Sequence, residues 1–293
     1  MKVIVLGTAA GGGLPQWNCA CELCTRCRRG ELAPRTQDCV AVSATGRDWF
    51  LLNAAPDLRA QLTATAELAP GPARRQTPLR GVLLTDAEID HTLGLALLRE
   101  GAGLTVWAPA PVLGALSTAL PLREVIGQYH DWAWRVAAPA FTLDDGRLEC
   151  AVFPLSGKRP RYAQAQPSAP DWVVAYRIRD PATGGVLAYA PCLATWPPGF
   201  SEFVADADCT LLDGTFHTAG EMSHVTASAT NEQRRMGHIP ITESLPLLNG
   251  GTTRWCYTHL NNTNPVADPA SPQHRAVTTH GTHIPADGAR FTL

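Results

Sequence analysis

The chain has 293 residues, of which 45% are hydrophobic and 17% are charged, a composition typical of a globular protein with a large core. Its net charge of −2 excludes the strongly basic surface that nucleic acid or an anionic membrane would require. No apolar run approaches the roughly 20 residues that span a bilayer, and residues 1–6 lead into a glycine-containing loop as a first strand does, unlike a signal peptide. We therefore expect a cytoplasmic protein that binds a small molecule.

Predicted strands and helices interleave along the whole chain. Two apolar runs at 40–43 and 49–52 flank a turn and predict a hairpin. In chain order there follow a helix from residue 56, a strand at 81–85, a helix at 92–99, a strand at 105–107 and short helices within 108–122. Later strands are predicted at 148–153, 172–178, 186–190, 210–212 and 254–257, with a surface excursion at 157–170. This pattern indicates an α/β fold with mixed sheets covered by helices, in a single domain over 1–293.

A hexapeptide of metal-ligating residue types, Asp86-x-Glu88-x-Asp90-His91, lies between a predicted strand and a predicted helix. Side chains at strand ends point into the loop face where α/β proteins usually bind substrates. Adjacent Asp and His supply an oxygen and an imidazole nitrogen, a pair that suits Fe, Mn or Zn. The alternative is an ordinary helix N-terminus, where acidic residues cap free N–H groups.

Two later segments favour the metal interpretation. Asp213 ends the apolar run Leu211-Leu212, and His259 ends the run Trp255-Cys256-Tyr257-Thr258. Each residue by itself is commonly a turn residue. Together with Asp90 and His91 they form the pattern of a metallohydrolase whose ligands come from several strand ends, so these four residues are the predicted ligands of a reactive metal.

The order of these segments resembles the metallo-β-lactamase superfamily, whose signature is H-x-H-x-D-H. Further motifs resemble one family in it, the PqqB family of pyrroloquinoline quinone (PQQ) biosynthesis, and the similarity extends over essentially the whole chain. These motifs are Gly11-Gly12-Gly13-Leu14-Pro15-Gln16-Trp17-Asn18-Cys19-Ala20-Cys21, Asp213-Gly214-Thr215-Phe216, Arg235-Met236-Gly237-His238 and His259-Leu260-Asn261-Asn262-Thr263-Asn264-Pro265. The resemblance implies a four-layer αβ/βα sandwich with the metal at the edge between the sheets.

One half of the superfamily's binuclear site is missing from the sequence. Asp86 and Glu88 stand where the signature has its first two histidines, and residues 155–158, where we expect the later histidine, contain none. One metal held by two imidazoles and carboxylates resembles the ligand set of non-heme Fe(II) oxygenases. This agrees with what the PqqB resemblance implies: Fe(II)- and dioxygen-dependent hydroxylation of the tyrosine ring of a Glu–Tyr-derived precursor.

A second metal-binding pattern is Cys19-x-Cys21-x-x-Cys24-x-x-Cys27, in a small cysteine-rich loop at 18–28. Thiolates at this spacing can surround one structural Zn²⁺; the alternative is a set of free buried cysteines. By resemblance to phosphodiesterase-like members of the superfamily, Cys19, Cys21 and Cys24 are ligands. The usual fourth ligand there is a histidine, which would be Asn262 here, so the fourth ligand stays open and Cys27 is a candidate.

Three further residues are candidate catalytic groups. His238 stands where superfamily relatives place an acid/base histidine and would move protons, although it could equally be a capping or core histidine. Asp86 and Glu88 would orient the ligating histidines, hold a weak extra metal or contact a substrate amine.

Two other functions stay open from the sequence. One is a phosphodiesterase-like or lactonase-like metal-dependent hydrolase, with Asp86 and Glu88 holding a second metal or with one metal alone. The other is a carrier that binds finished PQQ and transports it. A homodimer is an additional expectation that no motif decides.

Overall fold

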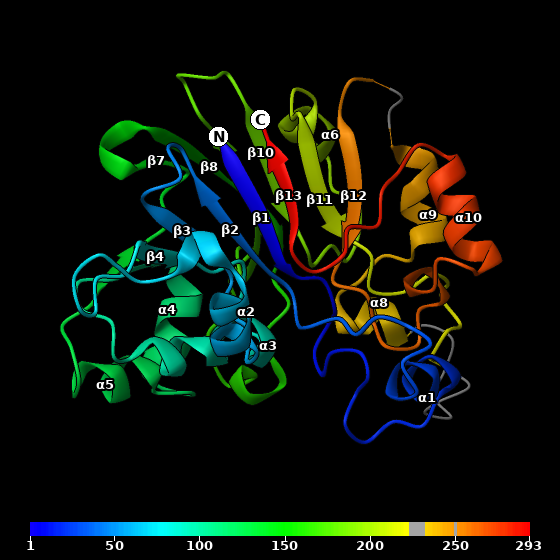
Figure 1. Cartoon of the computed structure of the whole chain (residues 1–293), viewed down its shortest axis with the longest axis horizontal. Helices are drawn as coiled ribbons and strands as arrows, with labels where there is room; N and C mark the ends of the chain where they lie inside the picture. Colours follow the sequence, from blue (N-terminus) through cyan, green and yellow to red (C-terminus); the bar gives the residue numbers. More distant parts are fainter. Residues whose placement is uncertain (223–231, 249–250) are drawn as a thin grey trace.

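The computed structural model describes residues 1–222, 232–248 and 251–293, which form two mixed β-sheets packed face to face (Figure 1). The strands of the first sheet, in spatial order, are β13 (Ala289–Thr292), β1 (Lys2–Gly7), β2 (Cys39–Ser43), β3 (Trp49–Leu52), β4 (Leu79–Leu83), β5 (Thr105–Ala108) and β6 (Ala133–Val136). The strands of the second sheet are β12 (Arg254–Thr258), β11 (Cys209–Asp213), β10 (Val186–Ala190), β9 (Val173–Arg179), β8 (Leu148–Ser156) and β7 (Ala140–Leu143). Each sheet combines antiparallel and parallel pairs.

The helices lie on the outer faces of the two sheets and at the edge where the loops meet. They are α1 (Glu22–Arg28), α2 (Leu58–Ala64), α3 (Ile89–Thr92), α4 (Ala110–Ser117), α5 (Leu122–Gly127), α6 (Phe200–Val204), α8 (Glu232–Met236), α9 (Ile241–Ser244) and α10 (Pro272–Thr279). Among the described residues, none of these helices is long and apolar enough to cross a membrane.

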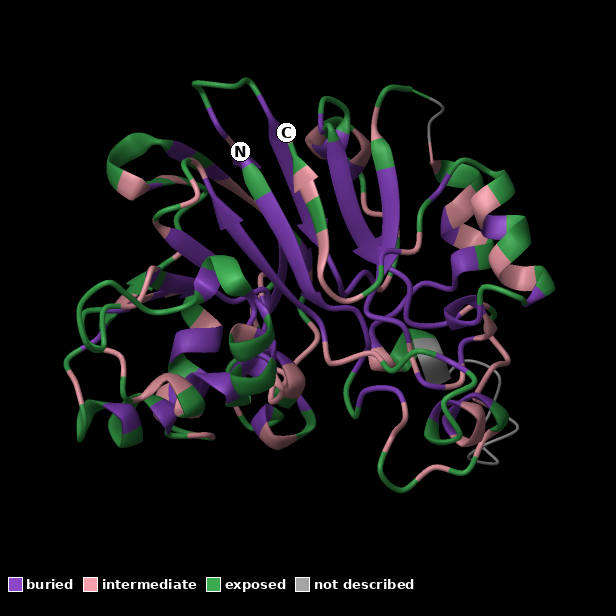
Figure 2. Cartoon of the chain, in the orientation of Figure 1, coloured by how far each residue is buried: buried purple, intermediate pink, exposed green. Residues whose placement is uncertain are grey.

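Three apolar clusters separate the four layers. The middle cluster joins alternate residues of the two sheets, such as Val3, Phe50, Tyr176 and Leu211. A second cluster lies between the first sheet and its helices, and a third lies between the second sheet and its helices. Most strand residues are buried, and the helices keep one side exposed (Figure 2). The predicted αβ/βα sandwich with mixed sheets is therefore confirmed.

The sequence located most strands and the hairpin, which β2 and β3 form as an antiparallel pair. The predicted helix at 92–99 is present as a 3-10 helix over Leu93–Leu98, in which Gly94 lies so close to Ala54 that an added Cβ would come 2.7 Å from the Ala54 carbonyl oxygen. Most residues of the predicted surface excursion at 157–170 are exposed or half-buried, and Ala163 packs into the apolar cluster between the first sheet and its helices.

Several strands end at the same edge of the sandwich. The carboxyl ends of β10, β11 and β12 face this edge, since β11 runs parallel to both β10 and β12 in the second sheet. The segment after β4 in the first sheet reaches the same edge, because Asp90 Oδ2 lies 3.3 Å from His259 Nε2. Leu260 pairs with Ala9 in an isolated bridge, which links this edge of the second sheet to the segment after β1. Residues distant in sequence are thereby brought to one place, where the candidate site lies.

Candidate metal centre

A pocket of about 500 Å³ opens at the shared strand ends. Its lining contains the predicted residues Glu88, Asp90, His91, His238 and His259, together with residues that the sequence did not single out. Asp86 and Asp213 lie behind this lining and bind its histidines.

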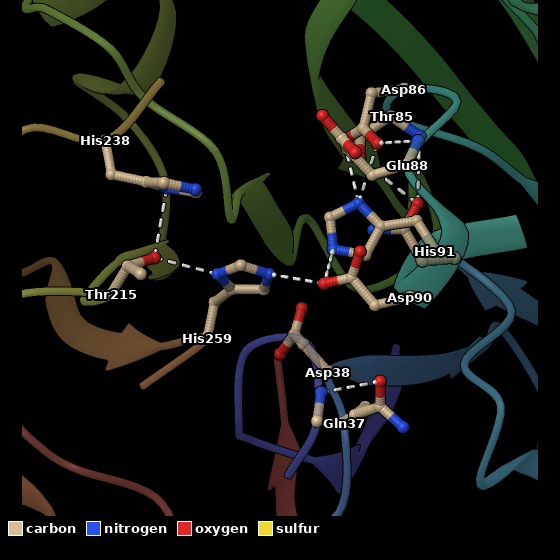
Figure 3. A network of polar contacts seen from close by, with 12 residues as sticks. Gln37, Asp38, Thr85, Asp86, Glu88, Asp90, His91, Thr215, His238 and His259 are labelled. Atoms are coloured by element: carbon tan, nitrogen blue, oxygen red, sulfur yellow. Dashed lines mark hydrogen bonds and ion pairs between the residues drawn. The ribbon is translucent and has the colours of Figure 1, made fainter. Parts of the chain in front are cut away.

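His91 is held from behind by Asp86 (Figure 3). Its Nδ1 lies 2.9 and 2.8 Å from the two carboxylate oxygens of Asp86, so Nδ1 carries the proton and donates it. The other ring nitrogen, Nε2, is buried and has no hydrogen-bond partner among the described residues. A buried ring nitrogen that lines a polar pocket, with the other nitrogen bound to a carboxylate, is the arrangement of a metal-ligating histidine.

His259 and His238 are oriented through Thr215 and Asp213. The Asp213 carboxylate accepts hydrogen bonds from Thr215 Oγ1 at 2.7 Å and from His238 Nδ1 at 2.8 Å. Because Thr215 donates its only proton to Asp213, it accepts from His259 Nδ1, 2.8 Å away. Both imidazoles therefore carry a proton on Nδ1, and Nε2 is the ring nitrogen left to face the pocket, where that of His259 is hydrogen-bonded to Asp90 Oδ2. The two rings are stacked, with centroids 5.3 Å apart.

Asp90 lies between the free nitrogens of the two predicted histidine ligands. Its Oδ2 is 3.3 Å from His259 Nε2 and 3.9 Å from His91 Nε2. Burial would raise the pKa of Asp90, but His91 and His259 hold it well below its usual range. The structure thus brings Asp90, His91 and His259 together with their ligand atoms converging. His259 adopts a φ of 57°, a left-handed conformation that is uncommon for a non-glycine residue and frequent at functional sites.

The charge of the cluster suits a cation. The carboxyl groups of Asp38, Asp86 and Asp213 are buried around the site, and the side chain of Asp90 is 19% exposed. Burial would lower the pKa of His91, but the carboxylates of Asp86 and Asp90 raise it to about 10. A site that draws a proton onto a buried imidazole has excess negative potential, which a bound metal ion would neutralise. The donor set, the unpartnered Nε2 and the charge all fit a metal.

Asp213 differs from the other predicted ligands. Its two oxygens already accept bonds from Leu193 N at 2.7 Å, Thr215 N at 3.0 Å, and the side chains of Thr215 and His238. It lies beside His259 and His238 in one potential metal cluster, whereas His91 belongs to another. In this arrangement Asp213 holds the loops and histidines in place, and direct ligation would require it to release one of these bonds.

Glu88 faces the pocket and pairs with Lys158. Lys158 Nζ lies 2.7 Å from Glu88 Oε1, and both side chains are about one-third exposed. Arg161 and Arg235 line the same pocket. The pocket thus has an acidic floor and three cationic groups near its walls, of which Lys158 is already paired. Such cations suit a ligand that carries carboxylates.

The cysteine-rich loop forms a second cluster. The thiol sulfurs of Cys19, Cys21 and Cys24 lie within 4.8 Å of one another. Asn262 fills the fourth side, with Nδ2 between 3.2 and 3.6 Å from the three sulfurs. Backbone N–H groups of Gln16 and Cys21 also point at these sulfurs, as they do around thiolate metal sites.

The prediction that Cys27 is a fourth ligand is wrong. All four cysteines are in the described residues, and Cys27 does not join the cluster. It lies three residues after Cys24 on α1, where it is buried among apolar side chains that include Leu23 and Leu32. Cys24 belongs to the same small core, but only its sulfur also joins those of Cys19 and Cys21.

Sequence reasoning missed three residues of the site. Cys192 lines the pocket and lies in a cluster with His91 and His259. The sequence directs attention to residues 155–158, after β8, as the place of a further ligand. In the structure, the loop after β10 brings Cys192 to the site. Thr215 is hydrogen-bonded to both His238 and His259. Its position two residues after Asp213 was the feature of the sequence that could have identified it. Gly11 passes so close to Asp90 that an added Cβ would lie 3.1 Å from its Oδ2, so the glycine loop borders the metal site as well as the cysteine loop.

The chain is similar to several characterised proteins. Residues 48–260 match the model of the β-lactamase superfamily domain. The chain is 38% identical to coenzyme PQQ synthesis protein B of Azoarcus sp. (strain BH72) and 36% identical to that of Azotobacter vinelandii, in each case over 100% of both chains. The crystal structure of Zn²⁺-bound PqqB from Methylobacterium extorquens superimposes with a TM-score of 0.91 at 32% identity over 100% of both chains. A diphosphatase of the PhnP family shares the fold, with a TM-score of 0.69 at 17% identity over 100% of this chain and 97% of that one.

Proposed function

The chain belongs to the PqqB family of coenzyme PQQ synthesis proteins within the β-lactamase superfamily, and from this premise we propose that it is an Fe(II)- and dioxygen-dependent hydroxylase. Its substrate would be the tyrosine ring of a Glu–Tyr-derived precursor of PQQ. The observation that supports a metal-dependent activity is Nε2 of His91. This nitrogen is buried, has no hydrogen-bond partner in the described part of the chain, and lies beside Asp90 and His259.

Asp90, His91 and His259 would hold the metal, with Asp213 next to it. A bound Fe(II) with open positions supplies the ability to bind dioxygen and to pass electrons to it. Hydroxylation places one oxygen atom in the ring and the other in water, so an external two-electron reductant is required. The protein's own contribution would be to orient the ligands: Asp86 and Thr215 bind Nδ1 of His91 and His259, so that each Nε2 would be available to the metal.

His238 would move a proton at the substrate. Its Nδ1 is fixed by Asp213 and Thr215, and its ring lines the pocket, so Nε2 is the nitrogen available to accept a phenolic proton. Arg161 and Arg235 would bind the carboxylates of the precursor, and Lys158 would do so in exchange with Glu88.

The hydrolase alternative has less support from the side chains. A second metal would need Asp86 and Glu88 as ligands, yet Asp86 binds His91 with both oxygens and Glu88 is paired with Lys158. A hydrolase of this fold typically uses two metals to polarise substrate and activate water. The cluster of Cys19, Cys21 and Cys24 is proposed as a structural Zn²⁺ site, because three sulfurs converge there with Asn262 on the fourth side, and thiolates at this spacing typically hold a structural zinc.

The test is anaerobic loading with Fe(II), followed by ¹⁸O₂, a reductant and a Glu–Tyr-type substrate, with mass spectrometry of the product. We expect incorporation of one labelled oxygen atom, which His259→Gln abolishes. Hydrolysis of the substrate by the Zn²⁺-loaded chain without uptake of oxygen would overturn the proposal in favour of the hydrolase. Tight binding of PQQ with the precursor unchanged would overturn it in favour of the carrier.

A further inference from the structure

We propose that Cys192 is a ligand of the active-site metal, so that the metal site contains a thiolate besides its two imidazoles and its carboxylate. This inference rests on the proposed metal centre and adds a residue to it. It assigns the pocket a mixed hard and soft donor set that neither the H-x-H-x-D-H signature nor the local sequence indicates.

The position of Cys192 is fixed by the second sheet. It lies two residues beyond the end of β10, whose last residue, Ala190, is in register with Leu212 of β11. The next residue, Leu193, donates its backbone N–H to Asp213 Oδ2 at 2.7 Å. The loop that carries Cys192 is therefore tied to the aspartate that also orients His238.

The thiol lies where a ligand is needed. The sulfur of Cys192 and one ring nitrogen each from His91 and His259 lie within 4.8 Å of one another, and all three residues are buried. Cys192 lines the pocket and is 8% exposed. Independently of the thiol, His91 Nε2 is a buried nitrogen with no hydrogen-bond partner among the described residues, and it points to the same space. Two imidazoles, a thiol and Asp90 thus surround one volume.

The chemistry of this set has consequences for metal choice. Thiolate is a soft ligand and imidazole a borderline one, so the set favours Zn²⁺ or Fe(II) over Mg²⁺ or Ca²⁺. Binding of the metal releases the thiol proton to solvent through the open pocket and forms one metal–sulfur bond, with no change in oxidation state. An ordinary buried cysteine would form no such bond, which makes the two possibilities distinguishable.

The experiment uses Co²⁺, because thiolate ligation to Co²⁺ gives a near-ultraviolet charge-transfer band and tetrahedral or five-coordinate Co²⁺ gives visible d–d bands. The full chain is stripped of metal under anaerobic reducing conditions and titrated with Co²⁺ as wild type, Cys192→Ser and Cys150→Ser. Cys150 is a matched control, since it is 3% exposed and lies in the core between the sheets. The thiols of Cys19, Cys21 and Cys24 contribute equally to all three proteins.

We expect all three proteins to bind Co²⁺ at both sites, and only Cys192→Ser to lose the charge-transfer share of a single thiolate. Equal charge-transfer intensity in Cys192→Ser and wild type, with both sites filled, would overturn the role of Cys192 and leave the metal centre standing. If the wild type binds Co²⁺ at the cysteine cluster alone, the metal centre is overturned, and with it the role of Cys192. If Cys192→Ser does not fold, X-ray absorption of the Zn²⁺-loaded wild type counts the sulfur ligands of both zinc ions together. The three sulfurs of the cysteine cluster plus one more support the proposal, and three alone overturn it.

Discussion

Asp86 binds Nδ1 of His91 with both carboxylate oxygens, at 2.9 and 2.8 Å, and is itself buried. This contact places the ring proton on the side away from the pocket and leaves Nε2 free. In the superfamily signature the first position is a histidine ligand. In this chain the position is Asp86, which orients His91, a proposed ligand.

Asp86→Asn should weaken binding of the active-site metal by about 10–100-fold, as expected for loss of an orienting carboxylate. The amide would also turn an N–H group toward a donor, because Thr85 Oγ1 and Glu88 N both donate to Asp86. Competition with a chromophoric chelator measures the affinity. Asp48→Asn, which removes a surface partner of Arg80, serves as the control and should leave the affinity unchanged. Equal affinity for Asp86→Asn and wild type would show that His91 needs no carboxylate.

Cys24→Ala and Cys27→Ala should differ in zinc content although both remove a buried thiol from α1. Cys24 belongs to the three-sulfur cluster, so its loss should abolish binding of the structural zinc. Cys27 packs in an apolar core, so its loss should keep the zinc and cost about 1 kcal/mol of unfolding free energy. Metal analysis per chain, with thermal unfolding, measures both effects; loss of zinc from Cys27→Ala would restore the original four-cysteine prediction.

Lys158→Gln should weaken binding of PQQ, used as a chromophoric ligand with carboxylates, by about tenfold, because a charge-assisted contact is lost. Lys158 lines the pocket and is held there by Glu88 at 2.7 Å. Arg147→Gln is the matched control, because it breaks a different ion pair of the same kind with Asp144, outside the pocket. Equilibrium dialysis gives the dissociation constants. Unchanged affinity in Lys158→Gln would remove Lys158 from the proposed carboxylate site.

Stability should fall as the pH rises through about 7, in part because of Glu221. Burial raises the pKa of Glu221 from 4.5 to about 7, although Thr263 and the His217 amide donate to it. The folded chain therefore holds this proton more tightly than the unfolded chain, and the contribution to stability present at low pH is lost as the pH rises through the folded pKa.

Glu221→Gln should flatten the decrease in melting temperature between about pH 5 and 8, since its amide carries no charge to be buried. Glu67→Gln is the control. Arg290 lowers the pKa of Glu67 to about 2, so the ion pair stabilises the fold by a constant amount between about pH 5 and 8, and its loss changes the pH dependence only at more acidic pH. Parallel pH profiles for Glu221→Gln and wild type would show that Glu221 does not titrate in this range.

Much of the candidate site could be predicted because its proposed ligands follow strand ends. Asp90, His91 and His259 each come shortly after an apolar run, and the carboxyl ends of neighbouring parallel strands meet at one edge of a sheet. Applying this rule needs only the sequence around each strand end, and the structure brings the three residues together. The role of Asp213 was only partly foreseen, because its spacing shows where it lies and not which hydrogen bonds saturate its oxygens.

Periodic apolar runs and the residues at their ends predicted the mixed sheets covered by helices and the residues Asp90, His91 and His259, because these are properties of short segments. The four-layer order and His238 were implied by the family resemblance. The tertiary structure was needed to show that Asp86 supports His91, that the Cys27 sulfur lies outside the group of three sulfurs and that Cys192 lines the pocket. These depend on how loops from two sheets pass one another, where a shift of a few ångströms decides whether two side chains share a metal or only a core. The spacing of residues within one segment of the sequence does not determine such a distance.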